Sequence, residues 1–346
     1  MKTTTVLIPI LIFLATALGA PPATAATEPP MDLRVSPQWV HDRLREDKKN
    51  WMVVEVSWGD ASQAYDKGHV PGAIHINTDE IEYDHFPAHR GTPGAKLGRS
   101  TTQEEDLAKG ISPDQTLPRN HWRIYPDRFL LPALAHMGIT RESRVMVTSH
   151  DILAAARLTW TLLYAGVADV RILDGGLTAW KDAGFTVSTT PVQRRPQNSF
   201  GLTRPGRPQY KADIDQVRNL VRQNAPVDLL DTRTWPEFSG VWAPYSYIPT
   251  KGRIPRSLWI GSGTTPWNVE HLLQADARFK PPAELAREWE TKGAKGRKTI
   301  FYCGTGWRSS VAFILARAAG WKEIQNMDGG WMIWSMENHP TPQPEK

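Results

Sequence analysis

The sequence predicts an α/β fold of two domains, each a mainly parallel sheet wrapped by helices. Three observations support this prediction. The chain has 346 residues, its motifs occur twice in the same order, and short apolar runs alternate with segments of helical periodicity. A domain has on the order of 150 residues, so the length corresponds to two domains. Strands that alternate with helices indicate parallel sheets.

The N-terminal segment has the pattern of a secretory signal peptide. Lys2 precedes an apolar run at residues 6–18, and an A-x-A pattern ends at Ala25. The apolar run is shorter than the roughly 20 residues that a membrane-spanning helix needs, and Pro9 interrupts it. We therefore expect residues 1–25 to be cleaved. The mature chain is expected to be periplasmic or secreted, without a membrane partner.

The charge and the cysteine count narrow the possible functions. The chain has 41 Lys and Arg against 36 Asp and Glu, a formal net charge of +5, and the basic residues form no long runs. Nucleic acid is therefore not an expected partner. A single cysteine, Cys303, allows no intramolecular disulfide, so the fold depends on its hydrophobic core. Such a lone thiol is either buried and inert or retained for its reactivity.

A weak internal duplication relates the two halves of the chain. The segment at residues 67–74 is echoed at residues 251–258, and the Asp-Gly-Gly segment at 173–180 is echoed at 327–334. The stretch between the two motifs is 30 residues longer in the first half. This difference places an insertion at about residues 77–125, which we interpret as a long surface excursion.

Each half has the same predicted order of elements. In the first half, apolar runs predict strands at residues 51–56, 145–148 and 170–173. A helix with apolar residues at helical spacing lies between the last two strands and carries Leu158, Leu162 and Tyr164. In the second half, the corresponding strands are predicted at 227–230, 299–302 and 323–326, and the helix carries Val311, Ile314, Leu315 and Ala318.

The tract at residues 191–208 is rich in Pro, Arg and Gly and has no periodicity. Such a composition is typical of a linker. It would separate a first domain at residues 31–190 from a second domain at residues 209–340.

The insertion contains His85, His89 and His121, which could reach the entrance of a site. None of these histidines has the spacing of a zinc-binding motif. We therefore predict no metal site.

One strand–turn–helix segment in the second half carries the predicted chemistry. An apolar strand ends at Cys303, a turn with Gly304 and Gly306 follows, and a helix is expected to begin near Ser309. This order places the thiol among inward-pointing backbone N–H groups at the positive end of a helix. Arg308 adds a fixed cation. Such surroundings lower a thiol pKa from about 8.5, so Cys303 is predicted to be a nucleophilic thiolate.

The motifs together resemble the rhodanese superfamily, specifically the tandem-domain thiosulfate and 3-mercaptopyruvate sulfurtransferases. The matching pieces are Gly-His-Val-Pro-Gly-Ala at 68–73, Asp-Thr-Arg at 231–233 with Glu237-Phe238, the Asp-Gly-Gly…Trp pieces at 174–180 and 328–334, and Cys-Gly-Thr-Gly-Trp-Arg-Ser at 303–309. They occur in the family's order over nearly the whole mature chain. The Tyr245-Ser246-Tyr247 insertion is similar to exported bacterial members.

This resemblance implies a sulfurtransferase that moves sulfane sulfur from thiosulfate, or from 3-mercaptopyruvate, to cyanide, a thiol or a protein thiol. The sulfur would travel as a covalent persulfide on Cys303, without another cofactor. The implied substrate-binding residues are Gly304, Thr305, Gly306, Trp307, Arg308 and, from the Asp-x-Arg motif, Arg233. An ion pair with Asp231 or Glu237 is an equal alternative for Arg233, and Lys251 and Arg253 are weaker candidates for the same rim.

The repeat places Ser149 opposite Cys303, followed by His150 and Asp151. A Ser-His-Asp string suggests a hydrolase, but the members of a catalytic triad come from separate elements of a fold. We therefore expect the first domain to be inactive and to form one wall of the cleft, as in the family.

Two other functions remain open on the sequence. A phosphatase of the Cys-x5-Arg type needs five residues between cysteine and arginine, whereas four separate Cys303 from Arg308. A non-catalytic carrier of sulfane sulfur or of an anion would have the same loop chemistry. Gly304, Thr305 and Gly306 replace the basic residues of thiosulfate-specific enzymes, so thiosulfate is favoured only slightly over mercaptopyruvate. We expect a monomer.

Overall fold

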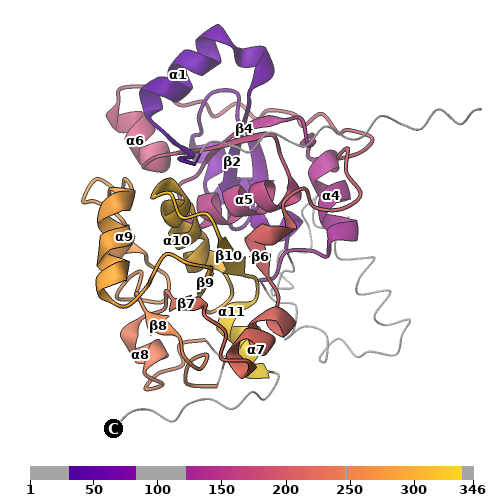
Figure 1. The fold of residues 1–346 in the computed structure, drawn as a ribbon. Helices are drawn as coiled ribbons and strands as arrows, with labels where there is room; N and C mark the ends of the chain where they lie inside the picture. The colour runs from indigo at the N-terminus through magenta and orange to yellow at the C-terminus, as the bar shows by residue number, and fades with distance from the viewer. Residues whose placement is uncertain (1–30, 83–121, 246–247, 249, 337–346) are drawn as a thin grey trace, which may run out of the picture.

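A computed structural model describes residues 31–82, 122–245, 248 and 250–336. Over these ranges the chain forms two domains, drawn one above the other in Figure 1. Each domain is built on a five-stranded sheet, and the paired strands within both sheets are parallel. The predicted α/β fold class is therefore confirmed.

The first sheet has the strand order β1-β5-β4-β2-β3. Its strands are β1 (Arg34–Val35), β2 (Met52–Ser57), β3 (Ile74–Asn77), β4 (Arg144–Thr148) and β5 (Asp169–Leu173). The helices of this domain are α1 (Pro37–Glu46), α4 (Asp127–His136), α5 (Ile152–Ala165) and α6 (Gly176–Asp182). Val53 and Val54 of β2 belong to different hydrophobic clusters, because helices cover both faces of the sheet.

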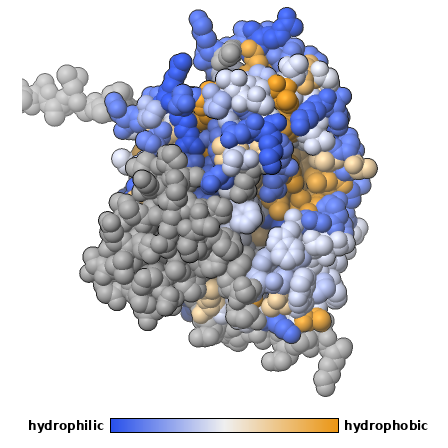
Figure 2. Space-filling model, turned by 180° about the vertical axis from the view of Figure 1, so that it is seen from behind, coloured by the Kyte–Doolittle hydropathy of each residue, from blue (hydrophilic) through white to orange (hydrophobic). Residues whose placement is uncertain are grey.

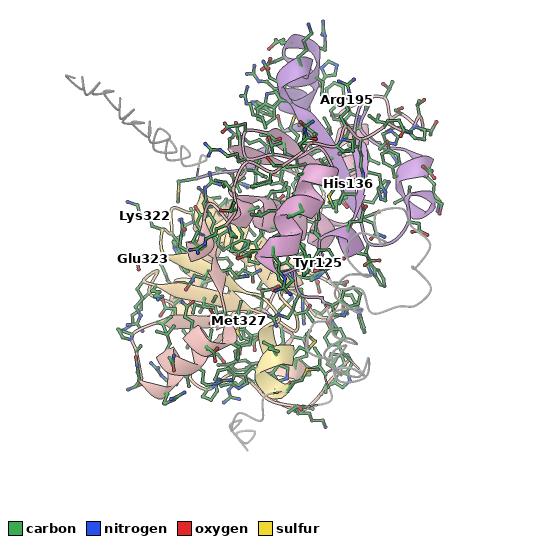
Figure 3. All side chains as sticks on the ribbon, turned by 90° about the vertical axis from the view of Figure 1, so that its right-hand side faces the viewer. Tyr125, His136, Arg195, Lys322, Glu323 and Met327 are labelled. Atoms are coloured by element: carbon green, nitrogen blue, oxygen red, sulfur yellow. The ribbon has the colours of Figure 1, made fainter. Side chains whose placement is uncertain are left out.

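The second sheet repeats this order as β6-β10-β9-β7-β8. Its strands are β6 (Lys211–Ala212), β7 (Asp228–Asp231), β8 (Leu258–Trp259), β9 (Thr299–Tyr302) and β10 (Ile324–Met327). Its helices are α7 (Ile214–Arg222), α8 (Trp235–Phe238), α9 (Pro282–Thr291), α10 (Trp307–Ala318) and α11 (Gly330–Met336). In Figure 3, β10 runs from the side of Lys322 and Glu323 to Met327. The matching strand order confirms the duplication that the motifs predicted.

The two domains meet through α5 and α10, which pack against each other at the centre of Figure 1. Residues 154–165 of α5 are all buried, as are residues 308–317 of α10. A helix that is buried around its whole circumference lies in the interior of a protein. Both helices therefore lie between the two sheets. Seen from behind in Figure 2, the described surface is hydrophilic over much of the upper part, and hydrophobic residues gather near the middle.

The predicted linker carries no helix or strand at residues 191–207. It is nevertheless fixed to the first domain. Arg194 forms an ion pair with Glu80 (2.6 Å), and Arg207 donates hydrogen bonds to the carbonyls of Leu163 (3.2 Å) and Val167 (3.0 Å).

Several predictions concern segments outside the described residues. These are the signal peptide at residues 1–25, most of the insertion and His85, His89 and His121. In the part of the chain that the structure describes, no helix has the length and hydrophobicity to cross a bilayer. One boundary was wrong: α10 begins at Trp307 and not near Ser309, because Gly306 in the left-handed region is its N-cap.

Candidate active site

Cys303 lies at the carboxyl end of β9, which is the central strand of the second sheet. In open parallel sheets, the loops at this edge form the ligand sites. All four residues of β9 are buried, and Cys303 itself is 2% exposed. The loop that follows leads directly into α10. The thiol therefore sits on a rigid strand at the base of a strand-to-helix loop, as the sequence predicted.

The start of α11 holds the carbonyl groups of this loop. Three backbone hydrogen bonds join the two segments: Trp331 N–H to the Cys303 carbonyl (2.8 Å), Met332 N–H to the Gly304 carbonyl (2.9 Å), and Gly329 N–H to the Thr305 carbonyl (3.0 Å). In a trans peptide the N–H points away from the carbonyl of the same unit. The loop N–H groups are therefore turned to the other side, where the thiol lies. A Cβ at Gly330 would overlap the Cys303 carbonyl oxygen, so this approach requires glycine.

These N–H groups stabilise the thiolate form of Cys303. Burial raises the pKa of the thiol, but the Arg308 guanidinium and the N–H groups of Ser309, Gly306 and Thr305 lower it by more. The net pKa of Cys303 is therefore below its ordinary value. The Gly306 N–H donates to Sγ over 3.1 Å, and its φ of +110° is readily adopted by glycine. The loop is an anion cradle with the sulfur of Cys303 at its base.

Arg308, the predicted cation, is buried and forms a two-pronged ion pair with Glu237. Its Nη1 and Nη2 each lie 2.9 Å from a carboxylate oxygen of Glu237. The Thr234 N–H and hydroxyl also donate to Glu237, at 3.0 and 2.9 Å. Burial raises the pKa of Glu237, but Arg308, Arg233 and the Thr234 N–H together lower it by more, so this carboxylate is ionised. Glu237 therefore compensates the charge of Arg308 in part, and the remaining effect of Arg308 lowers the pKa of Cys303.

A polar network behind the sulfur was not singled out in the sequence. The Ser309 hydroxyl lies 3.7 Å from Sγ and donates to the Asn326 side-chain carbonyl (2.6 Å). The Asn326 amide and the Ser310 hydroxyl both donate to the Gly306 carbonyl, at 3.0 and 2.7 Å. These contacts fix the turn at the start of α10. Asn326 comes from β10, and no spacing in the sequence relates it to the loop.

Arg157 of α5, in the first domain, contacts the loop that follows Cys303. Arg157 is fully buried and pairs with Glu82 (3.1 Å) and with Asp328 of the second Asp-Gly-Gly motif (2.7 Å). Its Nη1 lies against Gly306, and the Trp307 indole N–H donates to Glu82 (3.3 Å). Two buried carboxylates thus share one buried guanidinium. Burial raises the pKa of Glu82 to about 8, with Arg157 opposing this rise and Asp328 adding to it.

The first domain has the same loop architecture without a thiol. Its contacts are Leu177 N–H to the Ser149 carbonyl (3.2 Å), the Ser149 hydroxyl to the Val56 carbonyl (2.5 Å), and His150 Nδ1 with Glu55 (2.8 Å). Asp151 accepts a hydrogen bond from the Leu153 N–H as the N-cap of α5. Ser149 and His150 therefore have separate partners, and these residues form no hydrolytic triad.

Arg233 is buried and is held by an acidic neighbour. It is 2% exposed, and its Nε and Nη2 donate to the Asp231 carboxylate at 3.0 and 2.7 Å. Its Nη2 also donates to the Gly252 carbonyl (2.8 Å). Of the two predicted alternatives for Arg233, the structure shows the ion pair with Asp231. Its role in substrate binding stays a prediction.

A cavity of about 200 Å³ lies over Cys303 between the two domains. Its lining consists of Trp58, Trp122, Asp151 and Leu153 from the first domain and Tyr245, Pro266, Trp267, Cys303, Gly304, Thr305, Trp307 and Arg308 from the second. Five of the predicted site residues are thus brought together, and Gly306 contacts the sulfur through its N–H. Arg233, Lys251 and Arg253 are not among the lining residues. Across residues 31–82, 122–245, 248 and 250–336, no group of three or more His, Cys, Asp or Glu side chains is placed to hold a metal.

The sequence matches known proteins over most of its length. The rhodanese-like domain family matches residues 36–183 and 213–337. The chain is 35% identical over 319 residues to the thiosulfate sulfurtransferase YnjE of Escherichia coli K12, covering 89% of this chain and 64% of that protein. It is 27% identical over 308 residues to a putative thiosulfate sulfurtransferase of Mycolicibacterium smegmatis, covering 87% and 93%. The chain therefore spans slightly less than two thirds of the length of the Escherichia coli relative.

Solved structures with the same architecture include two enzymes. The crystal structure of YnjE has a TM-score of 0.75 and 33% identity, covering 91% of this chain and 69% of that one. The anaerobic ergothioneine biosynthesis enzyme from Chlorobium limicola, in complex with its natural substrate trimethyl histidine, has a TM-score of 0.76 and 27% identity. That alignment covers 91% of this chain and 71% of the other.

Proposed function

The chain belongs to the family of rhodanese-like domain proteins, and from this membership we propose that it is a sulfurtransferase that carries sulfane sulfur on Cys303. The observation that carries the proposal is the cradle of N–H groups around a thiol of lowered pKa. A persulfide is an anion that extends one sulfur atom beyond the thiolate. The N–H groups and the guanidinium that favour the thiolate therefore favour the persulfide as well.

The proposed cycle has two displacement steps. The Cys303 thiolate attacks the outer sulfur of thiosulfate, the sulfur–sulfur bond of thiosulfate breaks, and its electron pair leaves with sulfite. An acceptor thiolate or cyanide then attacks the outer sulfur of the persulfide, and the electron pair of that bond returns to Cys303. Charge is conserved in both steps, and neither requires an added oxidant or reductant.

We propose thiosulfate as the first donor to test, because relatives of this chain carry the name thiosulfate sulfurtransferase. 3-Mercaptopyruvate is the alternative donor, because no basic side chain occurs at residues 304–306 beside the sulfur. Cyanide, small thiols and protein thiols are the candidate acceptors. Turnover with these compounds distinguishes an enzyme from a carrier that forms the persulfide without releasing it.

The test is mass spectrometry of the intact protein before and after exposure to thiosulfate, beside a Cys303→Ser control. We expect a gain of about 32 Da that reductant removes and that the variant lacks. A gain from mercaptopyruvate alone would keep the mechanism and change the donor. No gain from either compound would contradict the proposal, and hydrolysis of a phosphate ester would then be the next assay.

We also propose that the protein is exported and acts as a monomer in the periplasm or outside the cell. The support is the charge and apolar pattern of residues 1–25. N-terminal sequencing of the protein recovered from each cell fraction tests the export. A mature protein that retains Lys2 would contradict it, and sedimentation at twice the chain mass would contradict the monomer.

A further inference from the structure

We propose that the cavity over Cys303 binds the sulfur acceptor through a cationic ammonium group, so that the acceptor class is small thiols that carry a quaternary or protonated amine. This inference rests on the proposed role of Cys303 as the sulfur carrier. The loop at the base of the cavity carries the sulfur in the proposed function, and the side chains around the cavity would bind the acceptor.

Two groups of aromatic rings line this cavity. In the first group, Trp122 packs edge-on against Trp58 and Trp307, with ring centroids 5.7 and 6.1 Å apart. In the second group, Tyr245 packs edge-on against Trp267 at 5.9 Å. Rings of this kind attract cations through the negative potential of their faces, and aromatic cages recognise quaternary ammonium groups. Trp58 and Trp267 are 44% and 62% exposed, so part of each ring is accessible to a small molecule.

The charges around the cavity also favour a cation. Among the described lining residues, Arg308 is the one cationic side chain, and Glu237 compensates it through two 2.9 Å contacts. Asp151 and the Cys303 thiolate are the anionic groups of the lining. After sulfur transfer the persulfide keeps the same negative charge. The loaded site therefore attracts a positively charged acceptor more than a neutral or anionic one.

Asp151 belongs to the cavity wall although it comes from the inactive domain. It is accessible to a small molecule, yet the surrounding walls reduce its hydration. This desolvation raises the pKa of Asp151, while the N–H groups of Leu153 and Ala154 lower it by less. The Asp151 carboxylate is less hydrated here than in bulk solvent, which destabilises its charged form. A bound ammonium ion would stabilise that charged form. The first domain, whose corresponding loop has no cysteine, thus contributes a charge to the cavity.

The size of the cavity limits the acceptor to a small molecule. Its volume of about 200 Å³ is below the roughly 300–1,000 Å³ of pockets that hold drug-sized ligands. With the ammonium group between the rings, the thiolate of a short aminothiol would face the outer sulfur of the persulfide. The thiolate forms the new sulfur–sulfur bond, the old one breaks, and its electron pair returns to Cys303.

Binding can be measured without sulfur transfer. We would titrate the full chain carrying Cys303→Ser with choline and with 3,3-dimethylbutan-1-ol, its uncharged analogue of the same shape, by isothermal calorimetry. We expect choline to bind at least about tenfold more tightly, because the two ligands differ only in the charge that the rings and Asp151 recognise. Equal affinity for the two compounds would overturn the inference.

Single substitutions test whether choline binds in this cavity. Asp151→Asn keeps an N-cap residue for α5 but removes the charge, and Trp267→Ala removes an exposed ring. Each should weaken choline binding about threefold to tenfold, whereas Trp235→Ala, which removes an exposed ring outside the cavity, should not. Choline binding that neither variant weakens would overturn the inference.

A last assay addresses transfer itself. With the unaltered Cys303, the KM for thiocholine should be at least about tenfold below that for 3,3-dimethylbutane-1-thiol. Equal KM values in a protein that gains sulfur from thiosulfate would refute the acceptor class and leave the proposed function intact. Failure to gain sulfur would refute the proposed function, and choline binding would still report on the cavity.

Discussion

Replacing Glu82 with glutamine is expected to stabilise the protein at alkaline pH. Glu82 is fully buried and shares Arg157 with Asp328. Burial raises the pKa of Glu82 to about 8, whereas the carboxyl group of the unfolded chain titrates near 4.5. Between these values the folded protein binds one proton more than the unfolded chain. The free energy of unfolding therefore falls as the pH rises through this interval.

The size of this loss follows from the two pKa values. One excess proton lowers the free energy of unfolding by about 1.4 kcal/mol for each pH unit, so the whole interval amounts to at most about 5 kcal/mol. Above the folded pKa the carboxyl group is ionised in both states and the loss stops growing. Glutamine resembles the protonated acid and cannot ionise, so Glu82→Gln lacks this loss.

The assay is urea denaturation of both proteins at several pH values from about 5 to 9. The difference in the free energy of unfolding should grow in favour of Glu82→Gln up to about pH 8 and then stay constant. Glu284→Gln, at an exposed position of α9, is the matched control because it removes a carboxyl group that is not buried. A pH-independent difference for Glu82→Gln would refute the reasoning.

Two further changes test the loop. Gly330→Ala places a methyl group on the Cys303 carbonyl oxygen and should slow persulfide formation at least about tenfold, as measured by rapid-quench mass spectrometry. The control is Gly184→Ala, at another glycine with positive φ but with open space around it, which should not slow the reaction. Equal rates for the two variants would contradict the role of α11. Arg308→Met combined with Glu237→Gln removes the buried pair without leaving a lone charge, and should move the pH dependence of iodoacetamide alkylation upward by about one unit or more, because the guanidinium lowers the thiol pKa. An unchanged pH profile would show that the N–H groups alone hold the thiolate.

Local pattern was sufficient for the fold class and for the centre of the site. Strands that are buried on both faces appear in a sequence as apolar runs. The strands at residues 299–302 and 145–148 were therefore predicted to within one residue of their ends. Cys303, Gly304, Gly306 and Arg308 are close in sequence, and one strand–turn–helix geometry fixes all of them. The Asp-Gly-Gly motif was recognised as a repeat, but its task of holding the loop carbonyls was not.

The surroundings of the thiol depended on contacts between distant segments. Glu237 lies 71 positions before Arg308, and Asp328 lies 171 positions after Arg157. The packing of the folded chain decides which carboxylate pairs with which arginine, because every Asp and Glu in the sequence carries the same negative charge. This is why Arg233 was left open between two roles, and why the partner of Arg308 was not predicted.

The aromatic lining of the cavity also depends on contacts between distant segments. Trp58 contacts Trp122 within the first domain, and Trp122 meets Trp307 of the second domain because α5 and α10 pack the two sheets together. Periodicity in a sequence reports which face of an element is buried, but not which other element covers it. The candidate nucleophile, Cys303, could therefore be predicted from adjacent residues, whereas the cavity over it was decided by the packing of the two domains.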